Sequence, residues 1–478
     1  MWHNRHVLII GIARQGLALA RYLARRGAQV TLNDRRPLEE LQAEQQSLAD
    51  LGDAGTKIAW IVGGHPLELL QDIDLVCISG GVPLSLPIVQ EAQRRGIPLS
   101  NDSQIFLEAA PCPVIGITGS AGKTTTTTLV GRMARAAAEM DAAGTAGYIP
   151  SRVWVGGNIG SPLLNEVDQM QPDDLAVMEL SSFQLEIMTR SPQVAAVLNI
   201  TPNHLDRHGT MDAYREAKAR ILAFQSPGGV AVLGRDDPGA WSLAGRVRGR
   251  LLSFGLSELP VGQEGVFLKG ENLTLRLNGA GGPQETLLMA KSMLELRGEH
   301  NLLNLLCACA IAAAVGLPPA AMQAGVQGFH GVPHRLEYIR TWKGARWYND
   351  SIATAPERAL AAVRSFHEPL VLLAGGRDKN LPWEEFAREV VERVDHLVLF
   401  GEAAGIIEQA LTRTGRLGQP GTCSITRCKG LKDAVQAAAA LVEPGDVVLL
   451  SPGGTSFDEF QDFEERGQCF VQWVKDLN

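Results

Sequence analysis

The sequence predicts an α/β protein of several domains. At 478 residues, the chain exceeds the size at which a single hydrophobic core is favourable, and about three domains are expected. Short apolar runs, glycine-rich loops and helix-compatible segments alternate in the first, middle and last parts of the chain. This alternation is typical of parallel sheets that carry helices on both faces. We therefore expect three α/β domains.

The stretch with the clearest chemistry is VIGITGSAGKTTTTTLVGRMARA, at residues 114–136. An apolar run enters a turn with two glycines, Lys123 and Thr124 follow, and a helix-compatible segment comes next. Glycines let backbone N–H groups approach phosphate oxygens, and a helix N-terminus adds roughly half a positive charge. Lys123 would reach the β- and γ-phosphates of a nucleotide, and Thr124 would bind Mg²⁺. The stretch predicts a P-loop ATPase-type domain, at residues 113–330, although Ile117 replaces the first glycine of the full pattern.

The composition argues against several classes of protein. Hydrophobic residues make up 45% of the chain and charged residues 20%, as in ordinary soluble proteins. The net charge of -8 argues against a broad nucleic-acid-binding surface. The seven cysteines include no CxxC pair, which argues against a disulfide framework and fits a reducing cytoplasm. The longest apolar run, at 302–317, is interrupted by Asn304 and is too short to span a membrane. We expect a cytoplasmic protein.

The first segment, VLIIGIARQGLALARYLARRGAQVTLNDRR, predicts a Rossmann-like domain at residues 1–112. We expect a strand at 7–10, a loop at 11–16, a helix to about residue 26 and a strand at 29–33. Ala13 replaces the middle glycine of the GxGxxG pattern, and Asp34 lies near the position of a ribose-binding acid. A nucleotide-type ligand, an NAD-dependent oxidoreductase and a βαβ unit without a ligand all remain open at this point.

Further polar side chains follow strands of the central segment. Glu179 ends an apolar run at 175–180, where nucleotide triphosphatases place a carboxylate that handles magnesium; a salt-bridged glutamate is the alternative. His204, Asp206 and His208 have a spacing that suits a metal, but loop histidines are more often structural. Periodicity predicts that Lys218 is a solvated lysine on a helix at 211–224.

Two other features of the central segment have no assigned chemistry. Asn301 and Asn304 lie one helical turn apart, and they would bind a base, cap the helix or satisfy each other in the core. The glycine-rich stretch at 255–289 predicts a small β excursion.

The last segment, at residues 331–478, predicts a second Rossmann-like domain. Strands are expected at 346–348, 370–374, 396–400 and 446–450, and each is followed by a polar or glycine-rich loop and a helix. Such sheets bind ligands at the carboxyl ends of their strands. Arg335 and Lys379 would neutralise a phosphate or carboxylate there, with plain surface cations as the alternative.

These motifs together resemble a known family. They read, in chain order, GITGSAGKTT, GGNIG, MELSSFQLE, NITPNHLDRHGT, YREAKARI, GEHNLLN, GVPHRLE, NDSIATAP, LLAGGRDK and LLSPGGTSFDEFQDFEERG. The chain resembles the Mur ligases, which are ATP-dependent amide-forming enzymes of peptidoglycan precursor synthesis. Within the family, it is most similar to the members that add D-glutamate to UDP-N-acetylmuramoyl-L-alanine. The N-terminal segment matches more weakly than the rest.

The resemblance implies a reaction and a set of catalytic residues. ATP would phosphorylate the carboxylate of the UDP-linked substrate, and the amine of D-glutamate would attack the acyl phosphate, with release of ADP and phosphate. The implied catalytic residues are Lys123, Glu179, His204 and Lys218. Lys218 matches a lysine that becomes N-carbamylated, and two Mg²⁺ ions are implied near Thr124, Glu179, His204 and the Lys218 carbamate. Carbamylation needs a neutral amine, so the site must lower the pKa of this lysine or trap the product.

The resemblance also implies binding residues, together with a monomeric protein. Those implied for ATP are Gly119, Ser120, Ala121, Gly122, Lys123, Thr124, Thr125, Asn301, Arg335 and Asp350. Those implied for the UDP-linked substrate are Arg14, Gln15, Asp34, Arg35, Arg36 and Asn158, with Arg36 as the better phosphate ligand. Those implied for D-glutamate are Thr354, Lys379, Ser456 and Phe463.

Three positions depart from the family pattern. Ala121 replaces an asparagine of the P-loop turn, Ile352 replaces a lysine of the last domain, and SGGVP replaces a Ser-Pro-Gly loop. A folylpolyglutamate synthase-like relative or another Mur ligase is the nearest alternative. A P-loop switch would leave the loops of the last domain without a role, and an NAD-dependent oxidoreductase would leave the P-loop without one.

Overall fold

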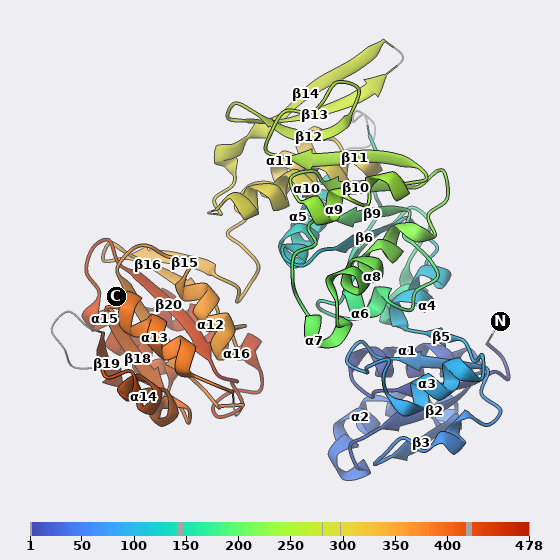
Figure 1. Ribbon diagram of the computed structural model, residues 1–478, viewed down its shortest axis with the longest axis horizontal. Coiled ribbons are helices and arrows are strands. Elements are labelled where there is room, and N and C mark those ends of the chain that lie inside the picture. Colours follow the sequence, from blue (N-terminus) through green and yellow to red (C-terminus); the bar gives the residue numbers. More distant parts are fainter. Residues whose placement is uncertain are drawn as a thin grey trace. The chain divides into compact units, whose positions relative to one another are not determined.

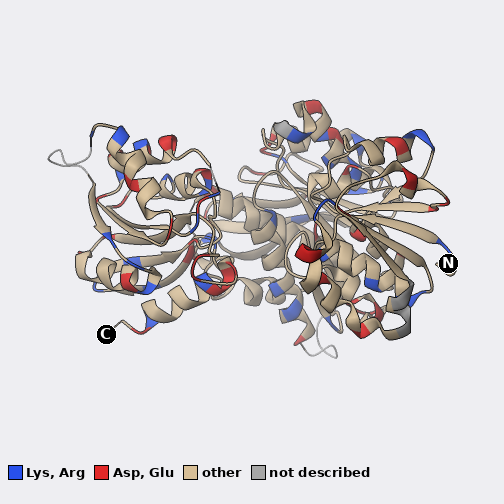
Figure 2. Cartoon of the chain, turned by 90° about the horizontal axis from the view of Figure 1, so that it is seen from below, with Lys and Arg blue, Asp and Glu red and all other residues tan. Residues whose placement is uncertain are grey.

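The computed structural model describes residues 2–140, 147–279, 281–296, 298–379, 381–416 and 423–477, with only the backbone of residues 53, 54, 56, 57 and 206 (Figure 1). The chain divides into two compact units, Met1–Phe329 and His330–Asn478. Within the described residues, the first unit holds two sheets and the second holds one. Charged residues of both signs lie mostly on helices and loops (Figure 2). The predicted α/β class is confirmed.

The first sheet is parallel throughout, with the strand order β3-β2-β1-β4-β5. Its strands are β1 (His6–Ile10), β2 (Gln29–Asp34), β3 (Ile58–Val62), β4 (Leu75–Ile78) and β5 (Leu99–Ser100). The accompanying helices are α1 (Arg14–Arg25), α2 (Gln42–Ser47), α3 (Pro87–Arg94) and α4 (Asp102–Ala109). The apolar run of β1 is buried, as expected for a parallel strand covered on both faces. The predicted βαβ opening is confirmed, with strand ends within one residue of those expected.

The second sheet has the order β14-β13-β12-β11-β10-β9-β6-β8-β7. Its first strands in the chain are β6 (Val114–Thr118), β7 (Val153–Gly157), β8 (Leu175–Glu179), β9 (Val194–Val197), β10 (Val230–Gly234) and β11 (Arg250–Gly255). These strands all pair in parallel. Because β6 lies between β8 and β9, the glycine turn that follows β6 emerges from the middle of the sheet, where such folds bind ligands.

The glycine-rich stretch at 255–289 extends this second sheet. It contains β12 (Glu264–Lys269), β13 (Asn272–Gly279) and most of β14 (Gly282–Ala290). β12 pairs in parallel with β11, and then β13 and β14 continue the sheet in antiparallel fashion. The predicted β excursion is therefore the antiparallel edge of the central sheet.

Seven helices are described in the remainder of the first unit. They are α5 (Lys123–Ala138), α6 (Ser182–Leu185), α7 (Leu205–His208), α8 (Met211–Ala223), α9 (Pro238–Trp241), α10 (Glu299–Val315) and α11 (Pro319–Val326). α10 is buried over Asn304–Ala312 and packs against α5, β10 and β11, which confirms the predicted buried helix. Within the described residues, no helix combines the length and the hydropathy that crossing a membrane requires.

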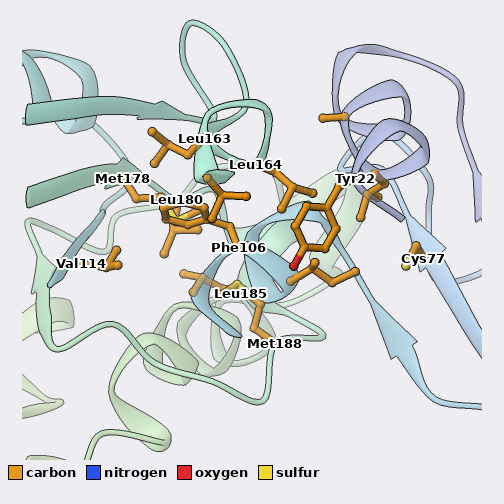
Figure 3. Packing of buried hydrophobic residues seen from close by; sticks show 14 of the residues in the cluster. Tyr22, Cys77, Phe106, Val114, Leu163, Leu164, Met178, Leu180, Leu185 and Met188 are labelled. Carbon is orange, nitrogen blue, oxygen red and sulfur yellow. The ribbon is translucent and has the colours of Figure 1, made fainter. Parts of the chain in front are cut away.

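One hydrophobic core joins the two sheets of the first unit. Figure 3 shows Tyr22 of α1 and Phe106 of α4 close to Leu164 and Leu185 of the central segment, and all four are buried in one cluster. Cys112, in the stretch that the sequence predicts as a linker, is buried in the same cluster. The linker is therefore part of the core that the two sheets share.

The second unit contains one sheet, with the order β15-β16-β20-β17-β18-β19. Its strands are β15 (Glu337–Trp342), β16 (Ala345–Asn349), β17 (Leu370–Gly375), β18 (His396–Phe400), β19 (Ser424–Arg427) and β20 (Val447–Gly453). Its helices are α12 (Pro356–Val363), α13 (Glu384–Arg393), α14 (Ala404–Arg413), α15 (Leu431–Leu441) and α16 (Phe463–Lys475). All pairs are parallel except β15 with β16. The four predicted strands are present, whereas β15 and β19 were not predicted.

Candidate active site

The glycine turn joins β6 to α5 in a conformation that requires glycine. β6 ends at Thr118, and α5 begins at Lys123, directly after Gly122. Gly122 has a φ of +81°, and a β-carbon at this position would lie 2.1 Å from Oδ1 of Asn304. The side-chain amide of Asn304 also donates to Oδ1 of Asn301 at 3.3 Å. Asn304 therefore packs against the turn, a role that the sequence did not indicate, while its hydrogen bond to Asn301 is one of the roles left open by the sequence.

Two lysine side chains converge on one carbonyl oxygen of the turn. Nζ of Lys123 donates to the carbonyl oxygen of Gly119 at 2.8 Å, and Nζ of Lys218 donates to the same oxygen at 2.9 Å. Lys218 lies on α8 and is only 1% exposed. Its Nζ lies 4.7 Å from the ring centre of Tyr214, one helical turn earlier. The structure thus places both predicted catalytic lysines at the P-loop.

The surroundings of Lys218 disfavour its protonated form. Burial lowers the pKa of Lys218 well below its ordinary value, and the positive charge of Lys123 lowers it further, although the Glu179 carboxylate opposes the shift. The periodicity-based prediction of a solvated lysine is wrong, because the face of α8 that carries Lys218 packs against β6. A lysine with a lowered pKa supplies the neutral amine that carbamylation requires.

Glu179 lies at the end of β8 and is held by two neutral donors. Its Oε2 accepts a hydrogen bond from the Thr124 hydroxyl at 2.9 Å, and its Oε1 accepts one from the Asn158 amide at 3.0 Å. The side chain is buried, with 1% of the residue exposed. Gly157 has a φ of +103°, and a β-carbon there would lie 2.5 Å from the Glu179 carbonyl oxygen. Glycine at this position therefore lets the GGNIG loop approach Glu179.

Thr124 and Glu179 suit a magnesium ion that binds together with a nucleotide. Mg²⁺ typically takes one or two carboxylates, phosphate oxygens and several waters instead of a closed set of protein ligands. The contact between Thr124 and Glu179 places two oxygen ligands at the start of α5, where phosphates bind. Among the described residues, no group of three or more His, Cys, Asp or Glu side chains is arranged to hold a metal by itself.

Other P-loop contacts were missed by the sequence analysis. The Ser120 hydroxyl lies 3.0 Å from the Tyr214 hydroxyl. The side chain of Asn199 accepts from the N–H of Ala121 at 2.8 Å and donates to the carbonyl oxygen of Ala121 at 3.2 Å. Thr125 is buried in the first turn of α5. The spacing of Tyr214, four residues before the buried lysine, was a signal that both side chains share one helix face.

The two histidines of the NHLDRH motif pack against the same aromatic ring. The ring of His204 meets Phe183 edge-on at 5.1 Å, and the ring of His208 stacks on Phe183 at 5.2 Å. His208 is buried, with Nε2 3.0 Å from the Ser182 hydroxyl. The side chain of Asp206 lies outside the described residues. His204 is exposed, and the Phe183 ring that it contacts lines a cavity. Lys123, Lys218 and Glu179 lie around the P-loop instead.

A cavity of about 650 Å³ lies at the carboxyl end of the first sheet. Loops after β1, β2 and β4 line it, together with the GGNIG loop and residues around Phe183 of the central segment. All six residues predicted for the UDP-linked substrate line this cavity, namely Arg14, Gln15, Asp34, Arg35, Arg36 and Asn158. The structure therefore brings together residues that are far apart in the sequence, from Arg14 to Asn158.

Asp34 organises one wall of this cavity. Its carboxylate accepts hydrogen bonds from the N–H of Ile12 at 2.8 Å and from the N–H and guanidinium of Arg36 at 3.0 and 3.2 Å. Burial alone would raise the pKa of Asp34, but these hydrogen bonds hold it below its ordinary value. Arg36 also pairs with Glu44 at 2.9 Å. Two carboxylates therefore bind Arg36, whereas Arg35 is exposed in the cavity wall.

In the second unit, Asp350 follows β16 and is buried. Its Oδ2 accepts from the Ser451 hydroxyl at 2.8 Å, and its Oδ1 accepts from the N–H of Leu336 at 3.2 Å. Burial raises the pKa of Asp350 to about 7, although these hydrogen bonds and the charge of Arg335 oppose the shift. Arg335 is exposed. The structure thus places the two predicted ATP-binding residues of this unit near each other.

The residues predicted for D-glutamate follow strands β16, β17 and β20. Nζ of Lys379 lies 3.4 Å from the Thr354 hydroxyl, so these two residues are brought together. Ser456 is buried in the loop after β20. Phe463 is the first residue of α16, and its carbonyl oxygen accepts from the Ser351 hydroxyl at 2.8 Å.

Arg466 was missed although it belongs to the last quoted motif. It is fully buried, and its guanidinium donates to the hydroxyl and carbonyl oxygens of Ser351 at 3.0 and 2.8 Å and to the carbonyl oxygen of Gly454 at 3.1 Å. Burial lowers its pKa to about 10. Because its acceptors follow β16 and β20, Arg466 fixes the two loops relative to each other.

Comparisons with known proteins agree along the whole chain. Residues 5–101 match the family model described as Mur ligase MurD-like, N-terminal domain; residues 117–312 match the Mur ligase middle domain; and residues 334–454 match the Mur ligase, glutamate ligase domain. A curated relative from Symbiobacterium thermophilum is 40% identical over 470 residues and covers 98% of each chain. Another, from Pelotomaculum thermopropionicum, is 41% identical over 475 residues and covers 99% of this chain and 98% of its own. Both are named UDP-N-acetylmuramoylalanine--D-glutamate ligase.

Solved structures support the same fold. UDP-N-acetylmuramate-alanine ligase from Thermotoga maritima is 18% identical, with a TM-score of 0.52 and coverage of 98% of this chain and 99% of its own. MurF from Acinetobacter baumannii is 20% identical, with a TM-score of 0.50 and coverage of 94% and 86%. The family models, the identity to curated relatives and the P-loop arrangement agree: the chain belongs to the Mur ligase family, whose members are ATP-dependent ligases that form amide bonds.

Proposed function

We propose that this chain adds D-glutamate to UDP-N-acetylmuramoyl-L-alanine in peptidoglycan precursor synthesis. The observation that carries the proposal is the convergence of Lys123 and Lys218 on the P-loop carbonyl of Gly119, beside the contact between Thr124 and Glu179. This arrangement suits transfer of a phosphoryl group from ATP. The choice of D-glutamate is supported by relatives of that name that match nearly the whole chain.

The proposed reaction has two bond-making steps. A carboxylate oxygen of the L-alanine moiety attacks the γ-phosphorus of ATP, which forms an acyl phosphate and releases ADP. The amine of D-glutamate then attacks the acyl carbon, loses a proton, and phosphate leaves from a tetrahedral intermediate. Transfer of this kind depends on positioning and neutralisation of charge more than on covalent help from the protein.

Residues of the P-loop have defined roles in this proposal. Lys123 neutralises the β- and γ-phosphates, and the N–H groups of Gly119 to Thr125 bind phosphate oxygens. Thr124, Glu179, His204 and Lys218 would hold magnesium, as two ions, which would neutralise charge on the transferred phosphoryl group. Lys218 would act as a carbamate, because its lowered pKa leaves an amine that reacts with carbon dioxide to give an anion.

The remaining assignments follow the segments of the chain. We assign residues 1–112 to the UDP-linked substrate, 113–330 to ATP and 331–478 to ATP and D-glutamate. In the first segment, Arg35 is better placed than Arg36 for a phosphate, because Arg36 is already bound to Asp34 and Glu44. Asn301, Arg335 and Asp350 would contact ATP. Lys379 and the hydroxyl of Thr354 would bind a carboxylate of D-glutamate, with Ser456 and Phe463 in the same pocket.

The test is a substrate panel. The purified protein is incubated with ATP, Mg²⁺, UDP-N-acetylmuramoyl-L-alanine and one amino acid at a time, and phosphate release and product mass are measured. With D-glutamate, we expect a product whose mass is that of the UDP-linked substrate plus one amide-linked glutamate. With L-glutamate, glycine or L-lysine, we expect no product. A product with another amino acid, or hydrolysis of ATP without any acceptor, would contradict the proposal.

A further inference from the structure

The loop that follows β4 forms part of the wall of the substrate cavity. Residues Gly80, Gly81 and Val82, here called the 80–82 loop, all line it. A β-carbon at Gly81 would meet no atom within 4 Å, and one at Gly80 would meet only the side chains of Gln15 and Gln184. Side-chain packing therefore does little to hold the glycine part of this loop in place.

Backbone contacts hold the 80–82 loop from two sides. The N–H of Gly80 donates to Oε1 of Gln15, on α1, at 3.0 Å. The carbonyl oxygens of Gly80, Gly81 and Val82 accept from the guanidinium of Arg207, on α7, at 3.5, 3.3 and 2.9 Å. Three consecutive carbonyl groups therefore point toward one cation, and the planar guanidinium offers the several donors that this arrangement needs.

Arg207 also contacts a part of the cavity wall that belongs to the central segment. The carbon at the centre of its guanidinium lies 4.2 Å from the ring centre of Phe183, which lines the same cavity. Arg207 therefore links the 80–82 loop of the first sheet to an aromatic side chain of the central segment. A second arginine, Arg14 on α1, links the first sheet's side of the cavity to the GGNIG loop of the central segment. Its Nη1 donates to the carbonyl oxygen of Gly160 at 3.2 Å.

We propose that Arg207 is a positioning residue for the UDP-linked substrate. Together with Gln15, it fixes the backbone of the 80–82 loop and so sets the shape of the cavity before the substrate binds. Without Arg207, the loop samples other conformations, and binding has to pay the conformational entropy of ordering it. This inference rests on the proposed function for the identity of the substrate, and it assigns Arg207 no contact with the reacting atoms.

Steady-state kinetics separate this role from a catalytic one. For Arg207→Ala, we expect KM for UDP-N-acetylmuramoyl-L-alanine to rise about tenfold or more, with kcat within about threefold and KM for ATP unchanged, as for the loss of charged hydrogen bonds. Arg207→Lys keeps the charge but not the planar set of donors and should recover only part of the loss. The matched control is Arg215→Ala, because Arg215 lies on the neighbouring helix α8 and pairs only with Asp212 among the described residues. An unchanged KM for the UDP-linked substrate, or an equal rise in KM for ATP, would overturn the proposal.

Hydrogen exchange tests, without any substrate, whether Arg207 and Gln15 hold the 80–82 loop. The amides of residues 79–86 should exchange faster in Arg207→Ala and in Gln15→Ala than in the wild type or in Arg215→Ala. Unchanged exchange in both variants would overturn the proposal. If the wild type forms no product with D-glutamate but exchange responds as expected, the proposed function fails, while the role of Arg207 in holding the 80–82 loop is retained. The affinity of wild type and Arg207→Ala for UDP, measured by calorimetry, then takes the place of KM as the test of substrate binding. Equal affinity of the two proteins for UDP would refute the positioning role.

Discussion

The ammonium groups of Lys123 and Lys218 donate to the same carbonyl oxygen, that of Gly119. Two positive charges at such short range repel each other, and burial makes the repulsion stronger because the local dielectric is low. The pKa of Lys218 is lowered for this reason in addition to burial itself. The arrangement therefore favours a neutral Lys218, and conversion of this amine to a carbamate would replace the repulsion by attraction.

Replacement of Lys218 tests this chemistry. Lys218→Ala removes the only atom that can carry the carbamate, so we expect ligase activity to fall about hundredfold or more, as when a charge-stabilising group is lost. Short carboxylates such as acetate should restore part of the activity, because they supply an anion in the vacated space. Lys291→Ala is the control, since Lys291 is a partly exposed lysine paired with Glu271. Full activity of Lys218→Ala, or wild-type protein that incorporates no isotopically labelled bicarbonate under chemical trapping, would contradict the carbamate role.

Substitution at Gly122 tests how tightly the P-loop is packed. In Gly122→Ala, the new β-carbon would lie 2.1 Å from Oδ1 of Asn304, and the φ of +81° is unfavourable for alanine. We expect KM for ATP to rise at least about tenfold, because the turn has to shift away from α10. Gly245→Ala is the matched control, because a β-carbon there meets no atom within 4 Å. Equal ATP affinity in both variants, measured by calorimetry, would show that the turn adapts without cost.

The fold was predictable where apolar strands and glycine loops alternate, and less so at the sheet edges. β1, β6 and β17 are buried, continuously apolar strands, and their sequence pattern is strong. β15 and β19 were missed because they lie at the two edges of their sheet, are only partly buried and contain arginine and threonine. Edge strands lack the continuous apolar run on which the prediction rested.

The candidate site was predictable only where it is local in sequence. Lys123 and Thr124 belong to one short motif whose strand and helix flank it, so the residues and their mechanism can be inferred together. Lys218 lies 99 residues from Gly119, and the period of α8 does not indicate which face meets β6. Asn199 and Arg466 likewise act through hydrogen bonds to residues distant in the sequence, which no local pattern indicates.

The contact between Lys379 and Thr354 leads to a prediction about amino-acid binding. In Lys379→Ala, a carboxylate of D-glutamate would lose a charge-assisted hydrogen bond, so we expect KM for D-glutamate to rise at least about tenfold while KM for ATP stays unchanged. Lys475→Ala, at an exposed position of α16, is the control. A larger effect on ATP than on D-glutamate would move Lys379 from the amino-acid pocket to the nucleotide.

A buried carboxyl far from the P-loop predicts a pH dependence of stability. Asp102 begins α4 and is 2% exposed, and Oδ1 has no hydrogen-bond partner among the described residues. Burial raises its pKa to about 7 from the ordinary 3.8, although hydrogen bonds from Ser103 and Gln184 oppose the shift. Between these two pH values, the folded state holds a proton that the unfolded state has lost. Its contribution to stability is therefore fully present below about pH 4 and is lost as the pH rises through about 7.

Asp102→Asn removes this titration while keeping the size of the side chain. We expect the free energy of unfolding of the variant, relative to wild type, to increase by about 3 kcal/mol as the pH rises from about 5 to about 8, because one pKa unit corresponds to about 1.4 kcal/mol. Above that range the difference should level off, since both states of the wild type are then ionised. Urea unfolding at a series of pH values measures it, with the exposed Asp72→Asn as the control. A difference that stays constant with pH would mean that Asp102 does not titrate in this range.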